Sequence, residues 1–160
     1  MRYCIDTNVL INCWYFWYPP ESHPTFWQGL EALARNNRLG FPEQVFEELE
    51  LQNDDLYNWC KDREDIFLLE SSDQLEETVA NLINGYPEFS GTGIGIGHSY
   101  ADVYVIAHGI VNSMQVVSME KMDGTSNPRK YKIPHICGFK GVDCIQPHEI
   151  IRAEGWVFSH

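Results

Sequence analysis

Short apolar segments alternate with longer helical segments along almost the whole chain, and this alternation limits the folds that the sequence can adopt. Apolar runs of strand length lie at residues 3–5, 39–41, 66–69, 115–118 and 142–145. Patterns typical of helices lie between them. Strands that alternate with helices form a parallel sheet that is covered on both faces. We therefore predict an α/β fold, a three-layer α/β/α sandwich with a central parallel sheet of four to five strands.

Helices are predicted at about residues 25–37, 42–50, 73–84 and 99–112. Thr25 is a suitable N-cap for the first, and Pro42 suits the first turn of the second. Asp73-x-x-Glu76 is a capping-box pattern at the start of the third. A chain of 160 residues without an internal repeat or a Pro/Gly linker is expected to form one domain over residues 1–160.

Several classes of protein are disfavoured by composition. No apolar run approaches the roughly 18 residues of a membrane span, and Asp6 interrupts the N-terminal segment where a signal peptide is apolar. We expect a cytoplasmic protein that does not bind membranes. The five cysteines include no C-x-x-C pair, which favours buried reduced thiols over a disulfide framework. His135 and Cys137 are close in sequence, but two ligands do not make a zinc site.

Two acids follow predicted strands. Asp6 ends the first strand, and Glu120 follows the strand at 115–118. Ligands of parallel sheets bind beyond the carboxyl ends of the strands, so both side chains should project into the same crevice. An acid after a strand also commonly caps the next helix, and this alternative remains open for Asp6.

Two further acids are expected on helices. Asp102 lies in an apolar helical segment, where an acid is costly unless it is paired or bound to a metal. A helix N-terminus also favours an anion, so a capping role for Asp102 remains open. In the helix at 42–50, Val45, Phe46 and Leu49 define the buried face. Glu47 then points into solvent and Glu48 lies at the border, where it can reach a crevice.

Four short motifs in order along the chain carry these acids. They are Tyr3-Cys4-Ile5-Asp6-Thr7-Asn8-Val9-Leu10, Val45-x-x-Glu48-Leu49, Ala101-Asp102-x-x-x-Ile106-Ala107 and Val116-Val117-Ser118-x-Glu120. Together they resemble the PIN nuclease domain from Met1 to about Glu120. The segment Lys132–Cys137, with Cys144 and the ending Arg152–Phe158, looks like an uncharacterised bacterial and archaeal PIN-like subfamily.

The resemblance implies a metal-dependent endoribonuclease whose acidic cluster is Asp6, Glu48, Asp102 and Glu120. Hard oxygen ligands suit Mg²⁺ or Mn²⁺, and clustered carboxylates cannot all stay ionised without such cations. The implied reaction is hydrolysis of an RNA phosphodiester by a metal-activated water, which leaves 5′-phosphate and 3′-hydroxyl ends.

The resemblance also implies supporting residues. Asn8 and Ser118 match polar positions that in the family support the cluster through hydrogen bonds. The chain departs from the family at two places. Many PIN domains have Thr-x-Asp where this chain has Ser118-x-Glu120, which makes the fourth acid one methylene longer. Many have Pro after the third acid, where this chain has Val103. Neither change removes a carboxylate.

The net charge of −12 is unusual for an enzyme that binds nucleic acid. Acids dominate the segment 43–77, whereas basic residues dominate the segment 121–140. The basic residues of that second segment are Lys121, Arg129, Lys130, Lys132 and Lys140. Because this segment follows Glu120, Arg129, Lys130 and Lys132 are predicted to guide the RNA backbone toward the acids. A solvated loop and a docking surface for an acidic partner are the alternatives.

The resemblance further implies a partner protein, because many small solitary PIN domains are toxins held inactive by a co-encoded antitoxin. An antitoxin or regulatory protein is therefore expected, and a homodimer is compatible with the sequence. One alternative is a degenerate PIN-like domain that binds RNA or a protein without cleavage, which the net charge favours. A phosphatase with an aspartyl nucleophile is disfavoured, because Asn8 stands where a second acid is needed.

Two other patterns carry weaker signals. Glycines at positions 91, 93, 95 and 97 lack the Gly-Lys-Ser/Thr ending of a phosphate loop, so a loop that gates the crevice is favoured over nucleotide binding. The aromatic run from Trp14 to Tyr18 is compatible with base stacking, although core or dimer packing is favoured by helical phasing. Pro19 and Pro20 end this helical segment.

Overall fold

A five-stranded, all-parallel sheet forms the centre of the computed structural model, which describes residues 1–89 and 100–158. The strands lie in the order β3-β2-β1-β4-β5. Their bounds are β1 (Tyr3–Ile5), β2 (Leu39–Pro42), β3 (Leu68–Leu69), β4 (Gln115–Val117) and β5 (Cys144–Ile145). The predicted α/β sandwich with a parallel sheet is confirmed.

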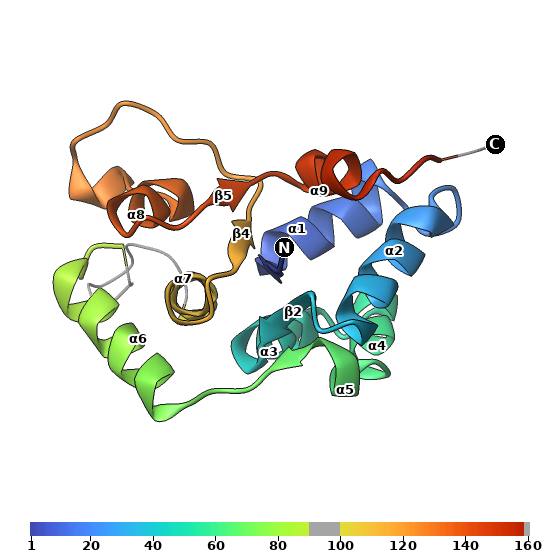
Figure 1. The fold of residues 1–160 in the computed structure, drawn as a ribbon, viewed down its shortest axis with the longest axis horizontal. Helices are drawn as coiled ribbons and strands as arrows, with labels where there is room; N and C mark the ends of the chain where they lie inside the picture. Colours follow the sequence, from blue (N-terminus) through green and yellow to red (C-terminus); the bar gives the residue numbers. More distant parts are fainter. Residues whose placement is uncertain (90–99, 159–160) are drawn as a thin grey trace.

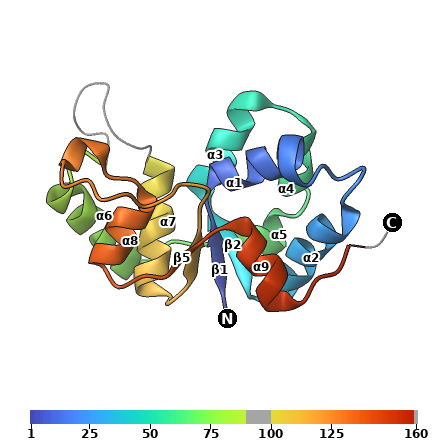
Figure 2. The same cartoon turned by 90° about the horizontal axis from the view of Figure 1, so that it is seen from above.

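Helices pack on both faces of this sheet (Figure 1). They are α1 (Thr7–Asn12), α2 (Pro24–Arg35), α3 (Glu43–Gln52), α4 (Asp55–Lys61), α5 (Glu64–Phe67), α6 (Asp73–Gly85), α7 (Tyr100–Val111), α8 (Ile133–Phe139) and α9 (Pro147–Glu154), with a π-helical turn η1 (Cys13–Trp17) and a 3₁₀ turn η2 (Pro128–Lys130). In Figure 2, α6, α7 and α8 lie on one side of the strands, and α1, α2, α4 and α9 lie on the other. Among the described residues, no helix is long and apolar enough to cross a membrane.

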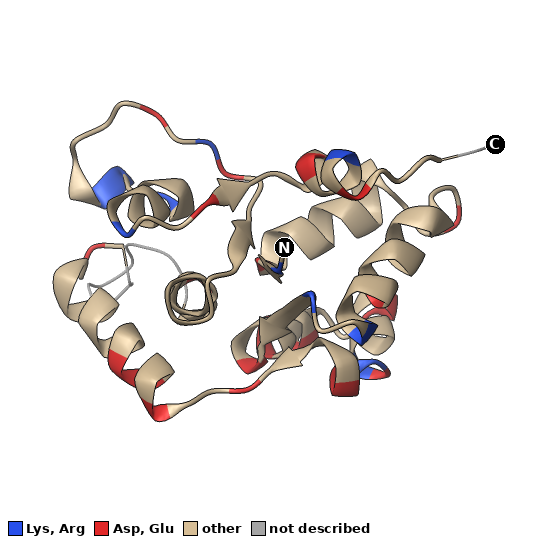
Figure 3. Ribbon diagram, viewed as in Figure 1, with Lys and Arg blue, Asp and Glu red and all other residues tan. Residues whose placement is uncertain are grey.

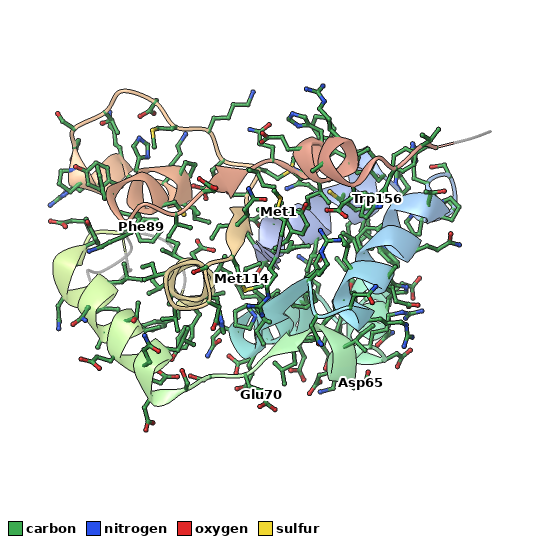
Figure 4. All side chains as sticks on the ribbon, viewed as in Figure 1. Met1, Asp65, Glu70, Phe89, Met114 and Trp156 are labelled. Carbon is green, nitrogen blue, oxygen red and sulfur yellow. The ribbon has the colours of Figure 1, made fainter. Side chains whose placement is uncertain are left out.

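The strands are short and apolar because both of their faces are covered. All three residues of β1 are buried, and Val116 and Val117 of β4 are fully buried. Side chains fill the space between the sheet and the helices (Figure 4). Trp156, labelled in that view, packs edge-on against Phe26 of α2 with 6.0 Å between the ring centroids. The segment after α9 is thereby joined to the core.

A polar network fixes α9 to the start of β1. The guanidinium of Arg38 donates to both carboxylate oxygens of Glu154, at 2.9 and 2.7 Å. The Tyr3 hydroxyl donates to the same carboxylate at 2.7 Å. The Tyr3 side chain is fully buried, and the hydroxyl is its one polar group. The Glu154 carboxylate therefore supplies the hydrogen-bond partner that a buried hydroxyl needs.

Three local expectations differ from the structure. Residues 66 and 67, expected in a strand, end helix α5, so β3 is only Leu68–Leu69. Ser72, and not Asp73, caps α6, since its side chain accepts the Leu75 N–H at 3.1 Å. Pro24 opens α2 and Thr25 lies inside it. In each case the observed boundary of the helix or strand lies within two residues of the predicted one.

Gly40 in β2 offers a test of how closely β2 and the α5–β3 segment approach each other. A Cβ at this position would meet the backbone oxygen of Phe67 at 2.6 Å and the Leu69 side chain at 2.8 Å. We expect Gly40→Ala to lower the free energy of unfolding by about 1–3 kcal/mol, because backbone atoms must move to admit a methyl group. Urea denaturation measures the loss. Gly85→Ala is the control, since nothing lies within 4 Å of its Cβ and little change is expected; equal effects of both changes would contradict the packing described.

Candidate active site

Asp6 lies at the carboxyl edge of the sheet, where β1 ends between its neighbours. Its backbone N–H donates to the Val117 oxygen at 3.1 Å, so the pairing of β1 with β4 continues through it. The side chain is 1% exposed, and it does not cap α1. Neither carboxylate oxygen has a hydrogen-bond partner among the described residues. The capping alternative is therefore excluded, and two buried acceptors are left unsatisfied.

Asp102 faces Asp6 from the first turn of α7, a helix that packs against β1, β2 and β4. Its side chain is only 7% exposed. Burial raises the pKa of Asp102 well above its usual range, and the neighbouring Asp6 carboxyl raises this pKa further. Glu120 and Glu48 act in the same direction through their charges.

Burial also raises the pKa of Asp6, with smaller increases from the charges of Glu120 and Glu48. The Asp102 carboxyl and the Thr7 N–H lower this pKa in part, although neither makes a hydrogen bond of good geometry with Asp6. The two aspartates therefore behave as a pair that holds protons more tightly than exposed aspartates do.

Glu48 joins the cluster from α3, and the predicted helical phase is confirmed. Val45, Phe46 and Leu49 are buried, Glu47 is exposed and Glu48 is half-buried. The Glu48 carboxylate accepts a hydrogen bond from the Thr7 hydroxyl at 2.6 Å. This contact ties α3 to the first residue of α1, directly beside Asp6.

Glu120 comes from the segment after β4. Its backbone N–H donates to the hydroxyl oxygen of buried Ser118 at 3.0 Å. Its carboxylate accepts the Ile133 N–H at the start of α8, also at 3.0 Å. Glu120 is therefore held at both its backbone and its side chain.

The four acids interact electrostatically, but they are not drawn tightly around one point. Among residues 1–89 and 100–158, no three His, Cys, Asp or Glu side chains are grouped closely enough to hold an ion. Thr7 and Ile133 hold the two glutamates by their carboxylates, and like charges oppose a closer approach. The donor set nevertheless fits Mg²⁺ or Mn²⁺, because it offers hard oxygens that include both unpartnered atoms of Asp6.

The supporting residues are partly different from those expected. Ser118 contacts the cluster as the resemblance implied. Asn8 does not, because it is exposed and its side chain shares no hydrogen bond with any described residue. Thr7 bonds to Glu48 instead. A hydroxyl residue immediately after Asp6 was the available signal in the sequence, but its partner lies 41 residues away.

The basic residues 129–132 lie beside the acids. Arg129, Lys130 and Lys132 line a surface hollow of about 420 Å³ together with Glu120. Figure 3 shows acidic residues spread over α3 and α6, with the basic stretch near α8. Lys140 lies apart from this hollow, with its ammonium 5.5 Å from the centre of the Tyr86 ring. The charge separation read from the sequence is thus also a separation in space.

Other sequence features have structural roles or lie outside the described residues. All five cysteines are free, and four are buried, as expected. His135 accepts the Lys132 N–H through Nδ1 at 3.0 Å, and its Nε2 is paired with the Asp123 carboxylate at 3.1 Å. The His135 ring therefore links the two ends of the segment from Asp123 to Lys132. The glycine-rich stretch at 91–97 is outside the described residues.

The parallel sheet and the arrangement of helices around it define a PIN-like domain. A chain in the crystal structure of VapBC2 from Rickettsia felis bound to a DNA fragment from their promoter is similar in fold. The TM-score is 0.52 at 16% sequence identity, and the match covers 91% of this chain and 98% of that chain. No curated protein matches this chain. The family model for a domain of unknown function, DUF4411, matches residues 3–158, and the chain belongs to that family.

The raised pKa values of Asp6 and Asp102 predict how the stability of the metal-free protein depends on pH. An acid whose pKa is higher in the folded chain than in the unfolded chain binds its proton more tightly when folded. The folded state therefore loses stability as the pH rises above the unfolded value of about 4. Asp102→Asn cannot ionise, so we expect it to exceed the wild type in unfolding free energy at pH 8 by at least about 1.4 kcal/mol, the equivalent of one pKa unit.

This difference should shrink toward pH 4, where the wild-type carboxyl is protonated in both states. Thermal unfolding in EDTA at pH 4, 6 and 8 measures it. Glu50→Gln, which changes an exposed acid outside the cluster, is the matched control and should follow the wild type. A pH dependence of Asp102→Asn that parallels the wild type would contradict the coupling of the two aspartates.

Proposed function

We propose that the protein is a metal-dependent endoribonuclease that hydrolyses RNA phosphodiester bonds and leaves 5′-phosphate and 3′-hydroxyl ends. The observation that carries this proposal is the Asp6 carboxylate, which is buried with both oxygens unpartnered among the described residues. Leaving a charged group buried without a partner costs several kcal/mol. A fold that keeps this carboxylate beside three further acids has a use for it, and binding a divalent cation is the use that suits the donor set.

Asp6 and Asp102 are the residues that would hold Mg²⁺ or Mn²⁺ most directly, with Glu48 and Glu120 completing the acidic site. The bound cation supplies an activated water and positive charge for the pentacovalent phosphate. The Thr7 hydroxyl and the Ile133 N–H orient the two glutamates by hydrogen bonds, and these carboxylates would move toward Asp6 and Asp102 when a cation binds.

Asp102 also has a role before the cation arrives. Its raised pKa means that it retains a proton near neutral pH, which lessens the repulsion between the acids. Binding a cation requires the ionised carboxylate, so the proton must leave from the Asp102 oxygen to solvent. Affinity for the metal is therefore expected to increase as the pH rises.

Arg129, Lys130 and Lys132 would guide the RNA backbone to the acids. A chain with a net charge of −12 repels RNA over most of its surface, so productive contact needs a local positive region. These three side chains share a hollow with Glu120, which supports that role. Substrate would then be attracted to a part of the surface that adjoins Glu120 of the acidic site.

We further propose that the protein is the toxin of a toxin–antitoxin pair and acts in the cytoplasm. The likeness to a VapBC2 structure supports this proposal, since that structure contains a complex. A co-encoded antitoxin is the expected partner. The competing function is a PIN-like domain that has lost activity and binds RNA or a protein, for which the net charge is the specific argument.

Cleavage of a mixed RNA pool in Mn²⁺ tests the catalytic assignment. Asp6→Asn and Asp102→Asn should abolish cleavage, as should EDTA in the wild type. Glu48→Gln should lower the rate at least about 100-fold, on the order of 3 kcal/mol in the barrier. Glu47→Gln is the matched control, one residue away on the same helix but exposed, and should have little effect.

Circular dichroism should show that each variant is folded. A folded Asp6→Asn or Asp102→Asn protein that cuts at the wild-type rate would make the assignment wrong. Equal losses in Glu48→Gln and Glu47→Gln would remove Glu48 from the site. Wild-type protein that binds RNA but never cuts it, with or without Mn²⁺, would establish the inactive alternative.

The salt dependence of RNA binding tests the role of the basic residues. Changing Arg129, Lys130 and Lys132 together to Gln should weaken binding and flatten the slope of log affinity against log salt by about 0.7 units for each lost contact with single-stranded RNA. The rate at saturating substrate should fall much less, since the acids are unchanged. Arg35→Gln with Lys61→Gln removes two exposed charges elsewhere and should leave the slope intact. An unchanged slope in the triple variant would exclude the guiding role.

A further inference from the structure

The aromatic run after α1 forms a single π-helical turn, η1, with a defined inside and outside. The Tyr18 N–H donates to the Cys13 oxygen at 2.8 Å, five residues back. Trp14 points inward and packs against Trp27, with 4.9 Å between ring centroids. Trp17 points outward and is 59% exposed. Single π-turns of this kind occur frequently at functional sites.

Both ends of this turn are anchored, so Trp17 is held by a rigid element. At its start, Trp14 also packs against Trp59, with 6.1 Å between the ring centroids. At its end, Tyr18 stacks on Phe26 with 4.6 Å between centroids, and its backbone oxygen accepts the Trp27 Nε1–H at 2.7 Å. A large aromatic ring on such a fixed backbone binds a partner ring at low cost in conformational entropy.

Trp17 and Tyr18 line a hollow of about 160 Å³ at the N-terminus of α9. Met119 and Lys121, which flank Glu120 in the chain, line the same hollow, as do Gln146 and His148. The volume of this hollow is several times the roughly 30 Å³ that one water molecule occupies in the liquid. The hollow is too small to hold an α-helix, which is about 10 Å across. The space suits a single planar ring system.

This hollow shares lining residues with a second one that reaches Glu120. Lys121 and Gln146 also line a neighbouring hollow of about 400 Å³, which reaches Glu120. Glu120 in turn lines the basic hollow beside Arg129 and Lys132. The three hollows are therefore linked through shared lining residues, and Glu120 is the member of the acidic cluster that lines the middle hollow and the basic one.

Resting on the proposed function, we propose that the hollow at Trp17 binds a nucleobase of the RNA substrate, one that flanks the cleaved phosphodiester. The base stacks on the indole of Trp17, and Lys121 faces the adjoining phosphate. Gln146 and His148 at the rim offer hydrogen-bonding groups to the base edge. A polynucleotide fits because it offers phosphates to the basic residues and a planar base to the hollow at Trp17, along a path that passes Glu120. Trp17 is thus assigned as a residue that positions the substrate and selects single-stranded RNA.

A double-mutant cycle between Trp17 and the bases of an RNA tests this assignment. The probe is a single-stranded oligoribonucleotide, together with variants in which one abasic nucleotide is moved stepwise along it. Binding is measured in Ca²⁺ by fluorescence anisotropy. Trp17→Ala should weaken binding of the intact RNA roughly 10-fold. One abasic position should weaken binding to the wild type by a similar factor, and it should cause no further loss in Trp17→Ala.

Phe16→Ala is the matched control, because Phe16 is the preceding residue of the same turn, is 75% exposed and does not line the hollow. It should bind like the wild type, and Trp17→Phe should retain most of the affinity. Equal unfolding temperatures of the Phe16 and Trp17 variants exclude a loss of fold as the cause.

The same RNAs in Mn²⁺ separate this inference from the proposed function. Cleavage without coupling between Trp17 and any base would overturn the nucleobase site and leave the ribonuclease intact. Coupling without cleavage would support the nucleobase site and overturn hydrolysis. Unchanged RNA affinity in Trp17→Ala, with loss of binding to a co-encoded protein, would instead make this surface a protein interface and overturn the inference.

Discussion

The pairing of β1 with β4 decides where the side chains of the site stand. Tyr3 lies opposite Leu39 of β2 on one side and Gln115 of β4 on the other, so three strands end at the same edge. The pairing extends one residue beyond β1, through the Asp6 N–H. A shift of one residue would turn Asp6 to the opposite face of the sheet. The buried apolar side chains of β1 oppose such a shift, and thereby also hold the carboxylate in place.

This arrangement buries carboxylates close to one another, which lowers the stability of the folded state. Other parts of the fold offset this loss. Asp6 and Asp102 are almost inaccessible, so burial disfavours the ionised form of both, and Asp6 further raises the pKa of Asp102. Glu48 and Glu120 are kept near but apart by the Thr7 hydroxyl and the Ile133 N–H. Native proteins commonly accept lower stability at the site where activity requires it. The core of strands and the Glu154 network, remote from the acids, supply the compensating stability.

Two surface regions of different chemistry lie near Glu120. Arg129, Lys130 and Lys132 share a hollow with Glu120 itself, and Trp17 shares one with Met119 and Lys121, which flank Glu120 in the chain. The acidic residues that give the chain its charge of −12 are spread over helices such as α3 and α6 (Figure 3). A strongly acidic protein can therefore carry a locally positive region, and in the function proposed above the repulsion elsewhere would narrow the routes by which RNA arrives.

The sequence by itself determined the features that depend on near neighbours. Apolar runs ended by turns specify the parallel strands, and the spacing of Val45, Phe46 and Leu49 distinguishes Glu48 from Glu47. Where two local signals competed, as at residues 66–67, the prediction of the element was wrong in part. Only the tertiary structure decided that Thr7 and not Asn8 holds Glu48, that Ile133 holds Glu120, and that Trp17 shares a hollow with the residues that flank Glu120. These contacts join segments far apart in the chain, and side-chain periodicity carries no information about which distant segments meet.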